Sequence, residues 1–283
     1  MSKQLKIAIQ GERTSFHDMA GQSYFSPQKI EIVECRTFRQ LCSEVMDRRA
    51  DMAVMAIENT LAGSLLPNYS LLQEFPLYII GETYLPIRHH LMALPGQALE
   101  DIHSVRSHPM ALHQCSEFLE HHPGMNAVET DDTAGSARQI REEELFGIAA
   151  IAGKMTAEFY RLEILAEGIE NLAQNYTRFL ILSADKPELR SDCQKASVNF
   201  RLKHRIGALA DVLNVFKNNN INLTKIQSIP VPGEPYEYLF LIEMEWEDYS
   251  NFEESIAEIE RFTIELKILG IYRSGNKSIA APQ

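Results

Sequence analysis

Apolar and polar positions alternate along the first two-thirds of the chain with the periods of strands and helices. Short apolar runs at residues 6–10 and 52–57 and an alternating apolar and charged run at 30–35 are typical of strands. Residues 16–25 and 37–49 between them have helical spacing. The run at 52–57 is almost continuously apolar, as expected of a strand that is covered on both faces. Strands that alternate with helices predict a mainly parallel sheet.

A second alternating set begins after two further predicted strands, at residues 77–83 and 88–94. It contains predicted strands at 104–107, 127–130, 147–151 and 162–166, and predicted helices at 109–121, 133–143 and 153–160. The two sets predict two α/β lobes, with the chain crossing near residue 80 and returning near residue 165. A crevice between two such lobes is a common place for a ligand.

The last third of the chain has a different order of elements. A polar segment at 184–195 is typical of a linker. Beyond it the pattern predicts strands at 196–203, 221–229, 236–245 and 264–272, and helices at 207–218 and 251–261. The order βαββαβ is that of the ferredoxin-like split unit. The predicted fold class is therefore α/β, with two lobes followed by a smaller βαββαβ domain.

Composition and charge narrow the possible classes of function. The chain has 283 residues and a net charge of −12, so no basic surface for nucleic acid is expected. No apolar stretch approaches the roughly 20 residues of a membrane span, and the N-terminus lacks the apolar core of a signal peptide. The four cysteines form no C-x-x-C pair, which predicts a reducing, cytoplasmic location without disulfides.

Four groups of polar residues fall at predicted strand ends or helix starts. They occupy residues 11–17, 58–64, 107–115 and 131–137. In the first, backbone N–H groups and the hydroxyls of Thr14 and Ser15 are placed to hold an anion at a helix N-terminus. Each group taken alone is also explained as an ordinary helix cap or polar turn.

Residues 175–182 are the most informative segment. Asn175, Tyr176, Thr177 and Arg178 stand at the mouth of an apolar strand, and ligands bind beside strand ends in open α/β domains. For this segment taken alone, a strand start with a capping threonine and a solvated arginine is the favoured explanation. Other chemistries are not indicated, since the histidines lack H-E-x-x-H spacing and neither a P-loop nor a G-x-S-x-G elbow occurs.

Taken together, these segments resemble prephenate dehydratases. The family carries E-N-[ST]-x-x-G, S-H-P-x-A-L-x-Q-C and N-x-T-R-F segments, which appear here in order at residues 58–63, 107–115 and 175–179. The opening turn of the family usually reads G-x-x-G, and here Thr14 replaces the second glycine. No chorismate mutase segment is evident on either side, so a monofunctional enzyme is expected.

The resemblance implies conversion of prephenate to phenylpyruvate with loss of water and carbon dioxide, without a cofactor or a metal. It implies that Thr177 donates a proton or hydrogen bond to the leaving hydroxyl, and that Asn59, Ser107 and Gln114 orient the substrate. The other residues that it places at the substrate are Glu58, Thr60, Gly63, Ser64, Thr14, Ser15, Phe16, Arg178 and Phe179. Arogenate dehydratase and a non-catalytic two-lobed ligand sensor are the alternatives.

The tail resembles the ACT regulatory domain of the same family. The implied domains are residues 1–186 (lobe one 1–80 and 165–186, lobe two 81–164), a linker at 187–195, the ACT domain at 196–275 and a tail at 276–283. The resemblance implies a homodimer or homotetramer that binds L-phenylalanine near Gly207, Ala208, Leu209, Ala210, Asn222, Leu223, Gln227, Ser228, Ile229 and Pro230. The family motif E-S-R-P is replaced by Gln227–Pro230, and the loss of two charged groups puts feedback by phenylalanine in question.

Overall fold

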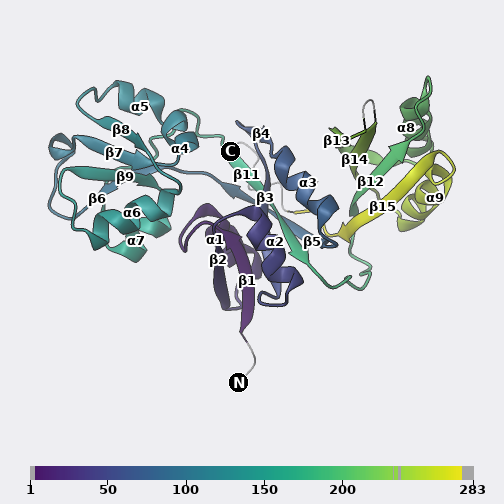
Figure 1. Ribbon diagram of the computed structural model, residues 1–283, viewed down its shortest axis with the longest axis horizontal. Coiled ribbons are helices and arrows are strands. Elements are labelled where there is room, and N and C mark those ends of the chain that lie inside the picture. The colour runs from purple at the N-terminus through teal and green to yellow at the C-terminus, as the bar shows by residue number, and fades with distance from the viewer. Residues whose placement is uncertain (1–3, 232, 235–236, 276–283) are drawn as a thin grey trace. The chain divides into compact units, whose positions relative to one another are not determined.

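The chain forms two compact units in the computed structural model, which describes residues 4–231, 233–234 and 237–275 (Figure 1). Among the described residues, the first unit comprises 4–65 and 83–179, and the second comprises 66–82 and 180–275. The two units reflect contacts between residues and do not define domains. The domain limits expected from the sequence therefore stay predictions. The predicted tail at 276–283 lies outside the described residues.

The first sheet carries the N-terminal lobe. Its strands are β1 (Leu5–Gln10), β2 (Ile30–Cys35), β3 (Met52–Asn59), β4 (Gly63–Ser64), β5 (Tyr78–Pro86) and β11 (Tyr176–Ser183). The order is β2-β1-β3-β11-β5, with β4 beside β3, and β1 runs parallel to β2 and β3. Helices α1 (Phe16–Phe25) and α2 (Phe38–Met46) connect these strands, and α2 buries Leu41 and Val45. Strands β5 and β11 continue into the second unit.

The second sheet carries the other lobe of the first unit. Its strands are β6 (His90–Ala93), β7 (Ser104–Ser107), β8 (Asn126–Glu129), β9 (Ile148–Ala152) and β10 (Glu163–Ala166), in the order β10-β6-β9-β7-β8. Its helices are the 3-10 helix η1 (Leu99–Asp101), α4 (Pro109–Gln114), α5 (Ser116–Glu120), α6 (Thr133–Glu142) and α7 (Lys154–Tyr160). The sheet is mixed, since β7 pairs in parallel with β8 and β9 while β6 is antiparallel to β9 and β10.

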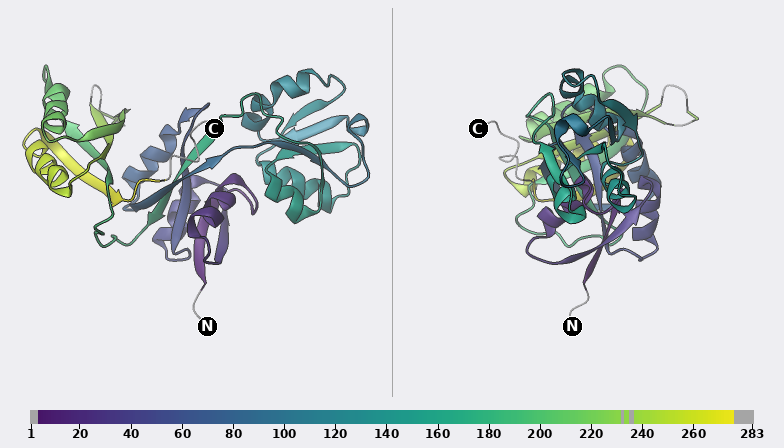
Figure 2. Two further views of the ribbon diagram at one scale, coloured as in Figure 1. Left: turned by 180° about the vertical axis from the view of Figure 1, so that it is seen from behind. Right: turned by 90° about the vertical axis from the view of Figure 1, so that its left-hand side faces the viewer.

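The second unit contains the predicted βαββαβ domain. Its elements are β12 (Lys195–Leu202), α8 (Ala208–Asn218), β13 (Asn222–Pro230), β14 (Tyr238–Glu245), α9 (Tyr249–Ile259) and β15 (Thr263–Tyr272). The strands form an antiparallel sheet in the order β13-β14-β12-β15, and α8 and α9 cover one of its faces (Figure 2). Val198 and Phe200 of β12 pack with Val212 of α8 and Phe252 of α9 in one apolar core. The split unit is confirmed.

Several elements differ from those predicted. Glu58 and Asn59 belong to β3, whereas a loop was expected after residue 57. The single helix expected at 109–121 breaks at Cys115 into α4 and α5. Helix α3 (Leu66–Glu74), in the second unit, was not predicted. The start of the strand expected at 236 falls on a residue outside those described.

The fold class of two α/β lobes with a C-terminal βαββαβ unit is confirmed. Within the described part of the chain, no helix has the length and apolar character that a membrane crossing requires. Cys35, Cys42, Cys115 and Cys193 are buried, and none of the four forms a disulfide.

Candidate active site

A cavity of about 310 Å³ lies in the first unit between residues of the two lobes. Lobe one contributes side chains from α1 and from the ends of β3 and β11. Lobe two contributes side chains from α4, from the start of α6 and from the segment before β6. Most of its wall is apolar, with Phe16, Phe38, Ile87 and Phe179 among the lining residues. The predicted crevice between two lobes is therefore present, and its polar groups stand against an apolar wall that limits access of water.

Asn59 and Thr177 meet at the floor of this cavity. The Asn59 Oδ1 atom accepts the backbone N–H groups of Leu61 and Ala62 at 3.0 and 2.9 Å, which fixes the orientation of the side-chain amide. Its Nδ2 group therefore donates to Thr177 Oγ1 at 3.0 Å and to Asn175 Oδ1 at 2.7 Å. The Thr177 oxygen is thus an acceptor, and its own proton has no acceptor among the described residues.

A buried chain of amides extends from this pair into lobe two. Asn175 is fully buried, and its Nδ2 group donates to Gln114 Oε1 at 3.1 Å. The same oxygen lies 2.9 Å from His89 Nε2. Asn59, Asn175, Gln114 and His89 come from segments that are far apart in the sequence, so the two lobes share one hydrogen-bonded network.

The opening turn brings a strained residue and a free hydroxyl to the same region. Thr14 has a φ of 70°, in the left-handed region that favours glycine, which explains why the family usually has glycine here. Ser15 lines the cavity at the start of α1, and its buried Oγ atom has no hydrogen-bond partner within the described chain. The unpaired N–H groups of a helix start and a free hydroxyl favour an anion.

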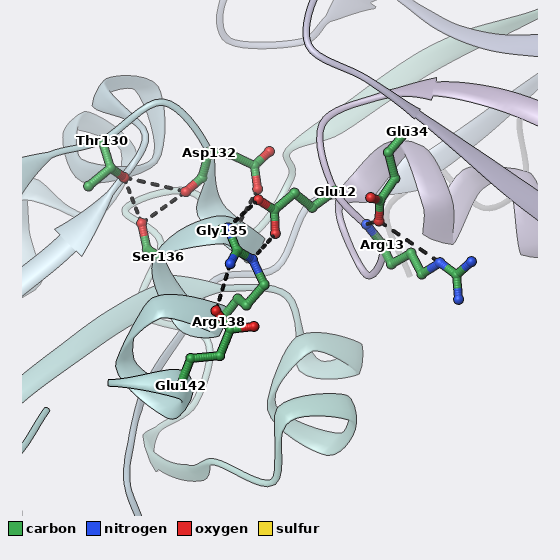
Figure 3. A network of polar contacts seen from close by, with 9 residues as sticks. All are labelled: Glu12, Arg13, Glu34, Thr130, Asp132, Gly135, Ser136, Arg138 and Glu142. Atoms are coloured by element: carbon green, nitrogen blue, oxygen red, sulfur yellow. Dashed lines mark hydrogen bonds and ion pairs between the residues drawn. The ribbon is translucent and has the colours of Figure 1, made fainter. Parts of the chain in front are cut away.

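A polar network joins this turn to α6 of lobe two (Figure 3). Arg138 donates to both carboxylate oxygens of Glu12, at 2.7 and 2.9 Å, and also pairs with Glu142 at 2.7 Å. Gly135 permits the approach, since a Cβ atom there would stand 3.2 Å from Glu12 Oε1. The Thr156 hydroxyl adds a second link by donating to the Thr14 carbonyl at 3.1 Å. These contacts connect the lobes beside the cavity.

Burial shifts the protonation of several groups around the cavity. Loss of hydration lowers the pKa of His17 to about 4 and also lowers that of His89, so both rings are neutral near pH 7. Burial raises the pKa of Asp132, and the nearby Glu12 carboxylate adds to the shift. Asp132 caps α6 by accepting the Gly135 N–H at 2.8 Å. Among the described residues no cluster of three or more metal-ligating side chains is present.

The structure brings some of the predicted site residues together at the cavity and leaves others outside it. The predicted residues that line it are Ser15, Phe16, Asn59, Gln114, Thr177 and Phe179. Those outside its lining are Thr14, Glu58, Thr60, Gly63, Ser64, Ser107 and Arg178.

Ser107 and Arg178 have partners within the protein, and their roles toward a ligand stay predictions. The Ser107 hydroxyl is fully buried and donates to the Ile151 carbonyl at 2.7 Å, which ties β7 to β9. Arg178 is buried, and its guanidinium lies 3.9 Å from the Glu58 carboxylate across β3 and β11. Thr60 accepts the Tyr176 N–H at 3.0 Å and so supports the start of β11. These side chains brace the strands that present Asn59 and Thr177.

Gly63 and Ser64 form the short strand that turns back along β3. Gly63 pairs with Asn59 and Ser64 pairs with Glu58 in an antiparallel ladder. Gly63 has a φ of 76°, which a residue with a side chain rarely adopts. This hairpin places the N–H groups of Leu61 and Ala62 on Asn59 Oδ1.

The cavity residues that were not predicted as site residues include His17, His89, Asp131 and Asp132. His17 and His89 fall inside runs that read as apolar faces, and only their hydrogen bonds to Ala56 and Gln114 reveal a polar role. Asp131 and Asp132 were noted as part of a capped helix start, which is the role that Asp132 has.

The predicted effector residues lie in the second unit, at the start of α8 and along β13. Gly207 has a φ of 77° before α8, and Ala208 and Leu209 line a separate cavity of about 150 Å³. Strand β13 is at the edge of its sheet and alternates between exposed and partly buried residues from Asn222 to Ser228. Effector binding at these residues stays a prediction.

Comparison with known proteins identifies the family. The family model described as prephenate dehydratase matches residues 7–187. The chain belongs to the prephenate dehydratase family. It is 32% identical over 281 residues to the bifunctional chorismate mutase/prephenate dehydratase of Enterobacter agglomerans, covering 98% of this chain and 73% of that protein. It is 36% identical over 280 residues to the chloroplastic arogenate dehydratase/prephenate dehydratase 2 of Arabidopsis thaliana, covering 95% and 72%.

Two solved structures are similar over nearly the whole chain of this family member. The prephenate dehydratase of Arthrobacter aurescens in complex with L-Phe superposes with a TM-score of 0.85 at 27% identity, covering 99% of this chain and 92% of that one. A protein described as GqqA, a novel type of quorum quenching acylase, superposes with a TM-score of 0.87 at 30% identity, covering 96% and 99%. The fold of this family thus hosts more than one described activity.

Proposed function

We propose that the chain catalyses the decarboxylating dehydration of prephenate to phenylpyruvate, carbon dioxide and water. One observation carries the proposal. The Thr177 oxygen accepts a hydrogen bond from Asn59, whose orientation is set by two backbone N–H groups, so the Thr177 proton is free for a ligand in the cavity. The main catalytic requirement of this reaction is a donor to the leaving hydroxide. A hydroxyl that directs its proton toward that hydroxide meets this requirement.

The reaction balances with one proton taken up. The bond between the ring and its carboxylate breaks, its electrons move through the ring, and the bond to the ring hydroxyl breaks as the ring becomes aromatic. Thr177 stabilises the departing hydroxide by its hydrogen bond, and solvent supplies the proton that completes water. The apolar wall of the cavity favours conversion of the ring carboxylate into neutral carbon dioxide.

Neutral donors are available for the carboxylates of the substrate. Ser15 offers an unpaired hydroxyl at the start of α1, beside backbone N–H groups of the first helical turn. Gln114 offers its side-chain NH2 group, which donates to no described residue. Such donors bind carboxylates without a formal positive charge.

Arogenate is the second candidate substrate, because the charges of the cavity favour it. No lysine or arginine stands among the described residues that line the cavity, whereas Asp131 and Asp132 do. Two carboxylates disfavour a dianion such as prephenate, and they would pair with the ammonium group that arogenate carries. The same dehydration chemistry at Thr177 serves both substrates.

Turnover of both substrates by the purified chain tests the proposal. We expect phenylpyruvate from prephenate, and the ratio of kcat/KM for prephenate to that for arogenate ranks the two candidates. Asp131→Asn is the matched control, since it should lower kcat/KM for arogenate and not for prephenate. Absence of product from both substrates would overturn the proposal and favour a non-catalytic ligand-binding role.

The acylase activity in the description of GqqA is less well supported by this cavity. Acyl transfer by a threonine hydroxyl needs an adjacent base to take its proton. Here the partner of Thr177 Oγ1 is the amide of Asn59, which donates and takes no proton. An assay for hydrolysis of N-acylated amines alongside the dehydratase assay decides between the two.

We also propose that residues 196–275 form an ACT domain that binds L-phenylalanine in a homo-oligomer. Support comes from the βαββαβ sheet order, from the exposed edge strand β13, and from the relative whose structure contains L-Phe. Calorimetry with L-phenylalanine and light scattering of the purified chain test both parts. Absence of binding at millimolar concentration would agree with the replacement of the charged motif by Gln227–Pro230 and would remove the effector from the proposal.

A further inference from the structure

We propose that His89 is a positioning residue that holds the side-chain amide of Gln114 with its NH2 group free for the substrate. The proposal rests on the proposed function, since it concerns the same cavity. His89 Nε2 lies 2.9 Å from Gln114 Oε1, and both residues line the cavity. A residue that acts through Gln114 in this way would affect substrate binding or turnover without touching the reacting atoms.

The direction of every hydrogen bond in the network follows from two backbone groups. Backbone N–H groups can only donate, so those of Leu61 and Ala62 require an oxygen at Asn59 Oδ1. Asn59 Nδ2 then donates to Asn175 Oδ1, and Asn175 Nδ2 donates in turn. The atom of Gln114 that receives this bond must be its oxygen. The backbone alone therefore sets the orientation of all three amides.

The same reasoning fixes the protonation of His89. Because Gln114 Oε1 is an acceptor, His89 Nε2 must carry a hydrogen and donate it. The Nδ1 atom is then the unprotonated one, and it is buried without a hydrogen-bond partner among the described residues. A buried acceptor left unsatisfied destabilises the fold, and such exceptions in native proteins call for a functional explanation.

Rigid contacts on both sides hold the donor and the acceptor in place. The His89 backbone N–H donates to Glu170 at 2.9 Å, and its carbonyl accepts from Ile169 at 3.0 Å. Asn171, which follows Glu170 in the chain, donates its backbone N–H to the Gln114 carbonyl at 2.7 Å. One segment, residues 169–171, thus anchors the backbones of both His89 and Gln114, and this fixes the spacing between their side chains.

A purely structural role is the competing explanation. The His89 ring also packs edge-on against Phe16, with ring centroids 5.5 Å apart, and is almost fully buried. A packing role needs the ring but not its N–H group. His89→Phe keeps a ring of similar shape and removes the donor, whereas His89→Gln can place an NH2 group at the position of Nε2 and loses the ring. The two roles therefore predict opposite orders of activity for these variants.

Nitrogen NMR of the full-length protein with 15N-labelled histidine tests the geometry without substrate. We expect a neutral His89 ring that is protonated at Nε2, assigned by the signal that His89→Gln removes. A ring protonated at Nδ1 would overturn the proposal. This measurement stands whether or not the protein turns over prephenate or arogenate, so it separates failure of the positioning role from failure of the proposed function.

Steady-state kinetics with the better substrate test the consequence. We expect kcat/KM to fall about tenfold in His89→Phe, as for loss of one well-placed hydrogen bond, and to return to within about threefold of wild type in His89→Gln. In a Gln114→Leu background, His89→Phe should cause no further loss. Wild-type kinetics in His89→Phe, no recovery in His89→Gln, or an additive loss in the double variant would each contradict the positioning role. Circular dichroism of each variant confirms folding.

Discussion

The side-chain amide of Asn59 donates a hydrogen bond to the hydroxyl oxygen of Thr177 at 3.0 Å, across two strands whose residues are 118 positions apart. This contact decides what Thr177 does. With its oxygen occupied as an acceptor, the hydroxyl becomes a directed donor toward the cavity. The backbone N–H groups of Leu61 and Ala62 hold Asn59 in the orientation that this requires.

Thr177→Val should lower kcat by about 100-fold or more, because it removes the donor to the leaving hydroxide and keeps the shape of the side chain. Thr177→Ser retains a hydroxyl and should stay within about tenfold of wild type. Steady-state turnover of prephenate and arogenate measures both variants. Equal turnover in the valine and serine variants would remove Thr177 from the reaction.

Asn59→Asp should lower kcat by about 100-fold near pH 7, because the introduced carboxylate cannot donate to Thr177 and would draw its proton away from the substrate. Protonation of the introduced carboxyl would restore a donor. The loss should therefore shrink as the pH of the assay is lowered, relative to wild type at each pH. A loss that does not change with pH would contradict this account.

His17 should make the protein less stable in acid. Its Nε2 atom accepts the Ala56 backbone N–H at 3.3 Å, and burial lowers the pKa of the ring from 6.5 to about 4 in the folded state. Between these values the unfolded chain binds more protons. The free energy of unfolding should thus fall as pH drops from 6.5 toward 4, by up to about 1.4 kcal/mol per pH unit from this group.

The contribution of His17 is measured by urea unfolding at several pH values for wild type and His17→Gln. The glutamine oxygen can still accept from Ala56, but the side chain does not titrate. We expect the difference in unfolding free energy between the two proteins to change with pH below 6.5 and to be constant above it. Parallel curves over the whole range would show that His17 titrates normally.

Thr14→Gly should raise the free energy of unfolding by about 1 kcal/mol. Thr14 has a φ of 70°, which costs a side-chain-bearing residue roughly 1–2 kcal/mol, and its buried hydroxyl lacks a partner in the described structure. Glycine relieves both and loses about 0.5–1 kcal/mol of that gain to the flexibility of the unfolded chain. Thr14→Ala is the control, because it removes the hydroxyl and keeps the strain. Thermal unfolding of both variants measures the difference.

Lys195 holds a buried cluster of charges in the second unit. Its Nζ atom lies 3.0 Å from both Glu82 carboxylate oxygens and 3.4 Å from Glu243 Oε2, and all three side chains are almost fully buried. Lys195→Met would remove the buried cation that lies beside these two buried carboxylates. We expect a loss of about 3–5 kcal/mol in unfolding free energy.

The matched control for this cluster is Arg190→Met. The Arg190 side chain is 76% exposed and pairs with Asp192 in solvent, so its loss should change the urea midpoint little. Similar losses of unfolding free energy in the two variants would show that burial does not determine how much the Lys195 ion pairs contribute to stability.

Most of the elements and the family segments could be predicted from the amino-acid sequence alone. Hydrophobic periodicity placed β1, α1, β2 and β3 within two residues of their observed limits, since period and burial are local properties of the chain. The order of the motifs was enough to single out Asn59, Gln114 and Thr177. It also showed that Thr14 replaces the usual glycine, and the observed φ of 70° explains why glycine is favoured at this position.

The hydrogen-bond partners of the polar side chains could not be predicted from the sequence, because they come from distant segments. Asn59, Asn175, Gln114 and His89 are joined by contacts between residues 116, 61 and 25 positions apart, and no local pattern encodes such pairings. Tertiary contacts also turned Ser107 to the Ile151 carbonyl. Periodicity reports which face of an element is buried, whereas a hydrogen bond depends on where a distant segment places its partner.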